Sequence, residues 1–562
     1  MSSILFLLFF CYNQIMITVK RQIEDLIKTT VTKTWPEVDF RKIDFKAERP
    51  KEKRYGDYSS NIAMQLSSFV EKEAMEIGKK IVGKIDWPRA FEKVLVVAPG
   101  FINFYLSHQW LKNQIKNVLE NKKFGQNDLG KNKRVQVEFV SANPTGPLHV
   151  GNGRGGFLGD VLANALAMSG YKVQREYYIN DRGKQIDILG ESVRYRFFQL
   201  SGIKIDYPDY CYQGEYIIDL AKKLSMINNY KLKDVSEIRE RIKVRALKMM
   251  LLQIQRFFSK TLKVKYDRWF SESSLVKRKI PEKMLDYLRQ KELSYKKDGA
   301  LWFKTSFFGD EKDRVLIKSG GEPTYFLTDI AYHFDKLALR KFDKVIDIWG
   351  ADHFGHRGRM LSAMRAIGFE GKLDIIIYQL VRLMQNGQEI RMSKRAGTYV
   401  TLEELIDEVG LDVARFFFLM YAADTHMDFD LNLAKEKSEK NPVYYVQYAH
   451  ARICSIIKNA NKLLKRKDAQ DKGAIEKIEE YDLIKEVLKL PEIIEEVATN
   501  YEVQKLPFYA QNLATKFHDF YTQCRVIDQD KLNLKRFKLI KVVKMTLEKV
   551  LKIMGVSAPE KM

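Results

Sequence analysis

The sequence predicts a multidomain α/β protein built around a doubly wound parallel sheet, and three observations lead to this prediction. The chain has 562 residues, more than a single hydrophobic core usually organises, so we expect several domains. Two segments far apart in the sequence follow the order strand, glycine-containing loop, helix, strand, which is typical of parallel crossover units. Residues 441–562 instead show only helical periodicity.

The N-terminal part, residues 16–122, is predicted to form a small α+β domain. It contains a helical opening, a basic and turn-rich segment "ERPKEKRYGDYSSN", an amphipathic helix and a strand pair in "VLVVAPGFINFYL". Residues 1–15 are a doubtful leader, because "ILFLLFFC" is too short to span a bilayer and lacks the flanking residues of a secretory signal. We expect the functional chain to begin at Met16, and a membrane anchor is the alternative.

Residues 123–400 are predicted to form a Rossmann-like domain with an insertion. In the first crossover unit the strand "KNKRVQVEFV" precedes a glycine-rich loop, a helix and the strand "KVQREYYI". In the second unit the strand "KVIDIW" precedes "GADHFGHRG", a helix and "LDIIIYQLV". The long charged stretch between the two units predicts an insertion at about residues 195–300.

The remainder of the chain is predicted to be helical. Residues 401–440 are expected to form a helical stem, mainly over Leu402–Met420. Residues 441–562 are expected to form a separate all-α domain, because apolar and aromatic residues recur there at helical spacing: Leu506, Tyr509, Ala510, Leu513, Phe517, Phe520 and Tyr521.

The composition indicates a polyanionic partner. Lys and Arg number 96 against 72 Asp and Glu, a net charge of +24, which favours nucleic acid over a merely solvated basic surface. The four cysteines, Cys11, Cys211, Cys454 and Cys524, lie far apart in the sequence. We therefore expect a reducing compartment, no disulfide framework and no protein-bound structural metal.

The loop "EFVSANPTGPLHVGNGRGG" follows an apolar strand and predicts a nucleotide site. Open α/β sheets bind ligands beyond the carboxyl ends of their strands, where helix N-termini attract phosphates. Glycines at Gly146, Gly151 and Gly153 allow a ligand to approach the backbone. His149 and Asn152 are three residues apart and can both donate hydrogen bonds to the negative charge of a nucleotidyl-transfer transition state. His149 alone is more often a structural histidine.

Two motifs taken together resemble the HIGH and KMSK signatures of class I aminoacyl-tRNA synthetases. They are "HVGN" at His149–Asn152 and "RMSK" at Arg391–Lys394; a solvated charged loop is the alternative for the second. The resemblance implies that His149, Asn152 and Lys394 are catalytic, although Asn152 replaces a histidine and Arg391 a lysine. It also implies an ATP site formed by Gly146, His149, Gly151, Asn152, Gly153, His353, Met392, Ser393 and Lys394.

Longer segments are similar to arginyl-tRNA synthetases over nearly the whole chain from Met16. They include "REYYINDRGKQI", "DGALWF", "TYFLTDIAYH" and "NPVYYVQYAHARI". The resemblance implies an arginine site formed by Glu138, Ser141, Asn143, Glu272, Tyr325 and Asp329. A guanidinium requires a fork of acceptors, and Tyr325 and Asp329, four residues apart, share a helix face. Alternatively, Asp329 caps a helix and Tyr325 belongs to the core.

The resemblance implies a two-step reaction without a covalent enzyme intermediate. Arginine attacks the α-phosphorus of Mg·ATP, and the adenylate then esterifies the terminal adenosine of tRNA(Arg), with catalysis by positioning and electrostatics. Family members characteristically need bound tRNA to activate arginine. Many use a lysine just before the HIGH segment, but residues 141–148 contain none, so Lys394 is the predicted catalytic cation.

Two groups of residues are predicted to bind tRNA. By resemblance, Arg54, Tyr58 and Asn61 lie near the D-loop, and Tyr444, Tyr448 and Arg452 belong to an anticodon-binding domain. A plain turn capped by Asn61 and packing of the tyrosines in a core are the alternatives.

We expect the partners to be tRNA(Arg), L-arginine and ATP with Mg²⁺, in a cytoplasmic monomer that does not bind membranes. Two rival functions stay open. One is a small-molecule nucleotidyltransferase with a similar loop, and the other is a non-catalytic RNA-binding relative.

Overall fold

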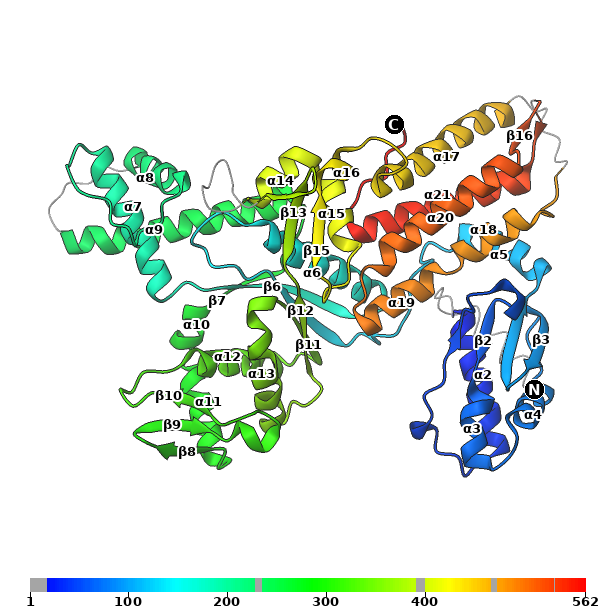
Figure 1. Ribbon diagram of the computed structural model, residues 1–562, viewed down its shortest axis with the longest axis horizontal. Helices are drawn as coiled ribbons and strands as arrows, with labels where there is room; N and C mark the ends of the chain where they lie inside the picture. The colour runs from blue at the N-terminus through cyan, green and yellow to red at the C-terminus, as the bar shows by residue number, and fades with distance from the viewer. Residues whose placement is uncertain (1–17, 228–234, 391–399, 466–472, 530) are drawn as a thin grey trace.

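The computed structural model describes residues 18–227, 235–390, 400–465, 473–529 and 531–562. The possible leader and Met16 lie outside these ranges. Figure 1 shows a small N-terminal domain beside a group of long C-terminal helices, with the central sheet and two lobes on the other side. The predicted multidomain α/β architecture is confirmed.

The N-terminal domain is an antiparallel sheet covered by helices. The strand order is β1-β2-β4-β3, and α2 is amphipathic, with Ile23, Ile27 and Val31 fully buried at helical spacing. Its elements are α2 (Val19–Thr34), β1 (Ala47–Glu48), β2 (Tyr58–Ser60), α3 (Ile62–Val70), α4 (Ala74–Lys84), β3 (Phe91–Val97) and β4 (Phe101–Leu106).

The helix that follows, α5 (His108–Glu120), does not pack on this sheet. It packs against α18 (Ile478–Val487) and α21 (Leu534–Met554), and the His108 ring stacks on Tyr481 with centroids 3.9 Å apart. The predicted boundary at residue 122 is therefore too late, because α5 belongs with the C-terminal helices. Its apolar stripe alone does not reveal which domain it covers.

Five parallel strands form the central sheet in the order β12-β11-β5-β6-β7. They are β5 (Arg134–Phe139), β6 (Lys172–Ile179), β7 (Arg268–Ser271), β11 (Lys344–Gly350) and β12 (Leu373–Tyr378). From β5 the chain runs through α6 (Val150–Met168) to β6, and later returns on the other side of β5 to form β11, followed by α13 (Phe354–Ala366). This reversal between β5 and β11 is a topological switch point, where ligands bind in such sheets.

The two faces of β5 differ in chemistry. Val135, Val137 and Phe139 are buried on the face toward α6, where a Cβ on Gly159 would lie 2.2 Å from the Phe139 ring. That glycine thus permits the close approach of helix and strand. The alternate residues Gln136 and Glu138 are also buried, so the opposite face of this central strand is polar.

The predicted single insertion is wrong, because β7 joins the central sheet and divides it into two. The first part holds α7 (Lys184–Leu200), α8 (Glu215–Ile227) and α9 (Val235–Arg256). The second holds α10 (Glu272–Lys277), α11 (Ile280–Gln290), the antiparallel strands β8 (Ser294–Lys297), β9 (Ala300–Phe303) and β10 (Arg314–Ile317), and α12 (Tyr325–Phe334). A four-residue edge strand is too short to be recognised from periodicity.

The predicted helical stem contains a strand. Helices α14 (Leu402–Val409) and α15 (Leu411–Leu419) are as expected, but β15 (Met427–Asp430) pairs in parallel with β13 (Val381–Gln385), which also pairs with β14 (Gln388–Ile390). The alternation of buried Met427 and Phe429 with exposed Asp428 and Asp430 is the period of a strand. After α16 (Leu431–Lys435) the chain enters the C-terminal domain.

The C-terminal domain is a helical bundle, as predicted. It comprises α17 (Pro442–Lys465), α18, α19 (Leu490–Asn500), α20 (Lys505–Gln523) and α21. Between α20 and α21, two short strands, β16 (Ile527–Asp528) and β17 (Lys531–Leu532), pair in antiparallel orientation. The residues predicted to repeat at helical spacing lie on α20, where Leu506, Leu513 and Phe517 are fully buried. Tyr521, the last of them, is 40% exposed.

Candidate active site

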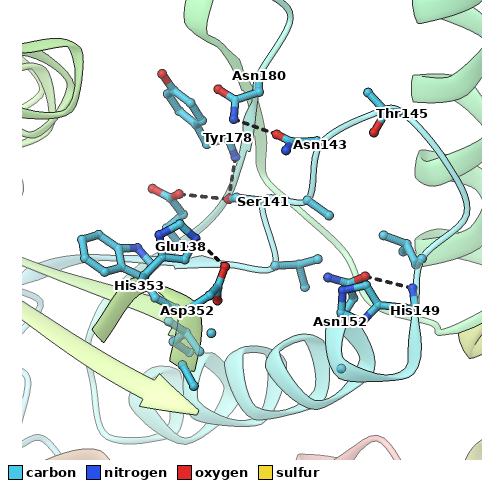
Figure 2. A pocket seen from close by; sticks show the side chains of 18 of the residues that line it. Glu138, Ser141, Asn143, Thr145, His149, Asn152, Tyr178, Asn180, Asp352 and His353 are labelled. Atoms are coloured by element: carbon cyan, nitrogen blue, oxygen red, sulfur yellow. Dashed lines mark hydrogen bonds and ion pairs between the residues drawn. The ribbon is translucent and has the colours of Figure 1, made fainter. Parts of the chain in front are cut away.

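A cavity of about 1180 Å³ lies at the switch point, at the carboxyl ends of β5 and β11. It brings together eleven of the residues predicted to bind ATP or arginine, and Figure 2 shows part of its lining. These residues are Glu138, Ser141, Asn143, Gly146, His149, Gly151, Asn152, Glu272, Tyr325, Asp329 and His353.

The chain turns sharply where β5 ends. Val140 and Ser141 have φ angles of 68° and 43°, a left-handed conformation that is unfavourable for a β-branched residue such as valine. The turn lets the Ser141 hydroxyl donate to Glu138 Oε1 at 2.9 Å and accept from the Tyr178 backbone N–H at 3.0 Å (Figure 2). The next loop is held by Asn180, which donates to Asn143 Oδ1 at 2.8 Å. The turn thus fixes polar groups at the cavity wall.

His149 and Asn152 lie side by side at the start of α6 (Figure 2). His149 is the N-cap of α6, and its backbone N–H donates to Asn152 Oδ1 at 3.0 Å (Figure 2). The Asn152 amide thereby closes the first turn of the helix, a role that asparagine performs better than histidine. Partial desolvation lowers the pKa of His149, against the opposing effect of Asp352, which favours a neutral ring at pH 7.

The glycines of this loop have different roles. A Cβ on Gly151 would lie 2.9 Å from the His149 ring, so Gly151 leaves room for that ring at the cavity. Gly153 is buried, and a Cβ there would lie 2.6 Å from Leu402. Gly153 is not among the residues that line the cavity. Its predicted place in the ATP site is therefore corrected, since this glycine allows α6 to pack closely against Leu402.

The residues predicted to bind the guanidinium converge from two helices. Tyr325 and Asp329 lie one turn apart at the start of α12, which is capped by Thr324, and Tyr325 is 82% exposed. These positions exclude both alternatives, a capping Asp329 and a core Tyr325. Glu272 begins α10 at the same cavity, and burial raises the pKa of its carboxyl.

Several side chains at the cavity were not predicted. His356 Nε2 lies 2.9 Å from Asp329 Oδ2, and the Trp349 and His353 rings lie 6.0 Å apart beside it. Below them, fully buried Lys336 contacts Glu138, and His333 contacts Asp347. Asp329, His333 and Lys336 follow one another at helical spacing, which is the one signal of this cluster in the sequence.

Arg154, directly after the HIGH-like motif, was also missed. It is 1% exposed and donates to four backbone carbonyls, of Gln379 (2.8 Å), Leu380 (3.4 Å), Ala422 (2.7 Å) and Thr425 (2.6 Å). Burial lowers its pKa to about 10. Arg154 thus joins α6 to the loops that follow β12 and α15. An arginine inside an otherwise small and apolar helix was the available signal.

The three residues predicted to meet the D-loop lie in different settings. Arg54 is exposed, and Asn61 is the N-cap of α3, without a side-chain capping hydrogen bond. Tyr58 is 1% exposed, and its hydroxyl donates to Glu492 Oε1 of α19 at 2.6 Å. The predicted base contact of Tyr58 is therefore corrected, since this side chain holds the N-terminal domain against the C-terminal domain.

The residues predicted to meet the anticodon lie on α17. Tyr448 is 37% exposed, and Arg452 donates to its hydroxyl at 2.6 Å. The guanidinium also lies 5.4 Å from the ring centre of Tyr521 on α20. Tyr444 is half-buried. Two exposed aromatic rings around a cation form a surface on which bases can stack.

Met392, Ser393 and Lys394 lie outside the described residues. The described chain resumes at residue 400, and Thr401 forms a β-bridge with His149 while Leu402 N–H donates to Leu148 O at 2.8 Å. Thr401 and Leu402 are thus joined to the loop before α6. Among the described residues, no three His, Cys, Asp or Glu side chains cluster to hold a metal, and no helix is long and apolar enough to cross a membrane.

Known families match three consecutive parts of the chain. Residues 19–106 match the family described as arginyl tRNA synthetase N terminal domain, residues 114–421 match tRNA synthetases class I (R), catalytic domain, and residues 446–562 match DALR anticodon binding domain. The fold, the cavity at the switch point and these matches define a class I aminoacyl-tRNA synthetase.

Individual relatives narrow the class. The arginine–tRNA ligases of Carboxydothermus hydrogenoformans and Bacillus subtilis are each 45% identical, covering 92% of this chain and 94% of theirs. Arginyl-tRNA synthetase from Thermus thermophilus has the same fold. Its TM-score is 0.76, at 22% sequence identity, over 97% of this chain and 100% of that one. The chain belongs to the arginyl-tRNA synthetases, a family of ATP-dependent ligases.

Proposed function

We propose that the chain joins L-arginine to the terminal adenosine of tRNA(Arg), and that both steps occur in the cavity at the switch point. The arginine carboxylate attacks the α-phosphorus of ATP, which arrives with Mg²⁺, and diphosphate leaves. A hydroxyl of the terminal ribose then attacks the carbonyl of the adenylate, and AMP leaves. The observation that carries the proposal is the meeting of the HIGH-like helix start with carboxylates from α10 and α12 in one cavity.

The nucleotide side of the cavity is formed by the start of α6. A helix N-terminus presents free N–H groups to phosphates, and Gly146, His149 and Gly151 lie there. His149 stabilises charge on the phosphate as a donor rather than as a cation, in keeping with its lowered pKa. Asn152 acts mainly by holding this helix turn. Lys394, which lies outside the described residues, supplies the cation at the diphosphate side of the transition state in this proposal, and His353 contacts the nucleoside.

The arginine side is formed by carboxylates. Asp329 and Glu272 accept from the guanidinium, Tyr325 covers it, and Asn143 holds the α-amino and carboxylate end. Ser141 and Glu138 form the wall behind the substrate. A lysine side chain lacks the second arm of a guanidinium fork and leaves one of these acceptors unpaired.

We further propose that tRNA binds through Arg54 and Asn61 of the N-terminal domain and through Tyr444, Tyr448 and Arg452 of α17 in the C-terminal domain. The net charge of +24 supports a ligand with many phosphates. We propose a cytoplasmic location, which four cysteines without a CxxC pair support, and a monomeric protein.

Arginine-dependent ATP–diphosphate exchange in the presence of tRNA tests this function. The wild-type protein is expected to show exchange with arginine and not with lysine or citrulline. His149→Ala is expected to lower the exchange rate about a hundredfold or more, because it removes one donor to the developing charge. Its tRNA affinity in a filter-binding assay should change less than about twofold. Exchange that does not depend on arginine would contradict the proposal.

A further inference from the structure

A line of buried polar side chains connects opposite walls of the arginine pocket. The Lys336 ammonium is 0% exposed and lies 2.6 Å from Glu138 Oε2 and 2.9 Å from Asp347 Oδ1. The other oxygen of Asp347 lies 2.6 Å from His333 Nε2. His333 Nδ1 lies 2.7 Å from the carbonyl oxygen of Asp329. The order of contacts is therefore Glu138, Lys336, Asp347, His333, Asp329.

Lys336, Asp347 and His333, the three inner members of this line, each contact a polar partner on both sides. Lys336 divides its protons between two carboxylates. His333 lies between two oxygen acceptors, with the Asp347 carboxylate at Nε2 and the Asp329 carbonyl at Nδ1. Burial alone would raise the pKa of Asp347, but Lys336 and His333 hold it at about 2, so Asp347 stays ionised. Burial likewise disfavours the ammonium of Lys336, yet Asp347 and Glu138 outweigh burial and raise its pKa.

Glu138 depends on this line most strongly. It lies on β5 with its carboxyl at the cavity wall, 6% exposed. Burial raises the pKa of Glu138, Asp347 and Glu176 add to that effect, and Lys336 is the cation that opposes it. The phenols of Tyr178, Tyr266 and Tyr332 are further titratable groups that interact with it. Without Lys336, a buried carboxylate would keep only the Ser141 hydroxyl as a partner.

We propose that Lys336 and His333 are positioning residues of the arginine pocket, which fix Glu138 and Asp329 in place and keep Glu138 ionised for a cationic substrate. The inference rests on the proposed arginine site. Lys336 is fully buried and is not among the residues that line the cavity, whereas His333 is. In this proposal each residue acts through a carboxylate or through the backbone of α12. Asp329 is thus held at its backbone carbonyl by His333 and at its carboxylate by His356.

Steady-state exchange kinetics with saturating tRNA, between about pH 6 and pH 8.5, test the inference. Lys336→Met is expected to raise the KM for arginine about ten- to hundredfold, the loss of a hydrogen bond to a charged group, with the KM for ATP within about twofold. Since the variant lacks the one cation that lowers the pKa of Glu138, this carboxyl takes up a proton as the pH falls. The KM for arginine should therefore rise toward acid pH more steeply than in the wild type.

Arg278→Met is the matched control. Arg278 also pairs with a buried carboxylate, Asp335, at 2.5 Å, but neither residue is among those that line the cavity. The control should lower the melting temperature and leave the KM for arginine and its pH profile unchanged. His333→Gln, a milder change that cannot bridge both acceptors, should raise the KM for arginine about three- to tenfold and serves if Lys336→Met does not fold.

Two results would overturn the inference. One is a Lys336→Met or His333→Gln variant with the wild-type KM for arginine and the wild-type pH profile. The other is an Arg278→Met variant that shifts both as strongly, since the effect would then be general destabilisation. Absence of arginine-dependent exchange in the wild type would instead contradict the proposed function, so the two failures can be told apart.

Discussion

Single residues in this cavity combine local structure with chemistry. Ser141 adopts a left-handed conformation so that one hydroxyl can bind both Glu138 and the backbone of β6. Asn152 closes the first turn of α6 where the HIGH signature has a histidine. The sequence motifs therefore lead to residues that line one cavity, whereas the hydrogen bonds of each residue depend on tertiary geometry.

Asp329 is where selectivity between cationic substrates is expected to be decided. Asp329→Asn keeps the shape of the side chain and removes its charge, so the KM for arginine should rise about ten- to a hundredfold while the KM for ATP stays within about twofold. Exchange kinetics measure both constants. Tyr295→Phe, which removes a hydroxyl bonded to Asp313 away from the cavity, is the control. Equal effects on arginine and ATP would contradict a role at the guanidinium.

At the scale of helices and strands, periodicity predicts the long elements and misses the short ones. The strands β5, β6, β11 and β12 and helix α6 are recognisable because each has a clear apolar pattern. The four-residue strands β7 and β15 are not, and both change the topology, one by dividing the insertion and the other by completing a sheet in the stem. Likewise, Tyr325 and Asp329 are named by the family resemblance, with which their spacing of four agrees. Lys336 and Arg154 are not predicted, because their partners come from distant segments.

Arg154 is expected to stabilise the contact between α6 and the loops at its side. Arg154→Met removes a buried guanidinium that donates to four backbone carbonyls, of which those of Leu380 and Ala422 keep a backbone donor. It should lower the free energy of unfolding by about 2–4 kcal/mol. Chemical denaturation followed by circular dichroism measures this change. Arg382→Met, which removes only an exposed pair with Asp428 on the adjacent strands, should lower it by less than about 1 kcal/mol. An equal loss of unfolding free energy in the two variants would show that the hydrogen bonds of Arg154 stabilise the protein no more than an exposed ion pair does.

At the scale of the whole molecule, ion pairs and hydrogen bonds connect the first domain to the last. Tyr58 donates to Glu492, Lys53 lies 2.6 Å from Asp482, and Lys485 lies 2.7 Å from Asp57. Arg49 binds both Tyr58 and Glu492. Figure 1 shows the N-terminal domain beside α18 and α19 accordingly. Three domains could be predicted from the sequence, but this closure could not, because it joins residues more than 400 positions apart.

The basic surplus predicts how tRNA binding responds to salt. The affinity for tRNA should fall steeply as the salt concentration rises, because bound phosphates release their counterions. Filter binding at several salt concentrations gives the slope. Arg452→Gln should reduce the slope by roughly one ion, and Arg382→Gln, far from the aromatic surface of α17, should leave it unchanged. A flat dependence in the wild type would contradict the assignment.

The domain closure is expected to support aminoacylation from a distance. Glu492→Gln should weaken the partners of Arg49 and Tyr58 and raise the KM for tRNA several-fold, at most about tenfold, while arginine and ATP constants stay unchanged. Glu436→Gln, at the entrance of the C-terminal domain, is the control. Aminoacylation kinetics separate these constants, and an unchanged KM for tRNA would show that the contact is dispensable.

The contact between Tyr58 and Glu492 fixes the position of the N-terminal domain relative to the C-terminal domain. Because the two domains are joined at this contact, the distance between the two proposed tRNA-binding surfaces is set before tRNA binds. A tRNA whose elbow and anticodon are separated by a different distance does not contact both surfaces at once. The length of the tRNA thereby becomes a criterion of selection.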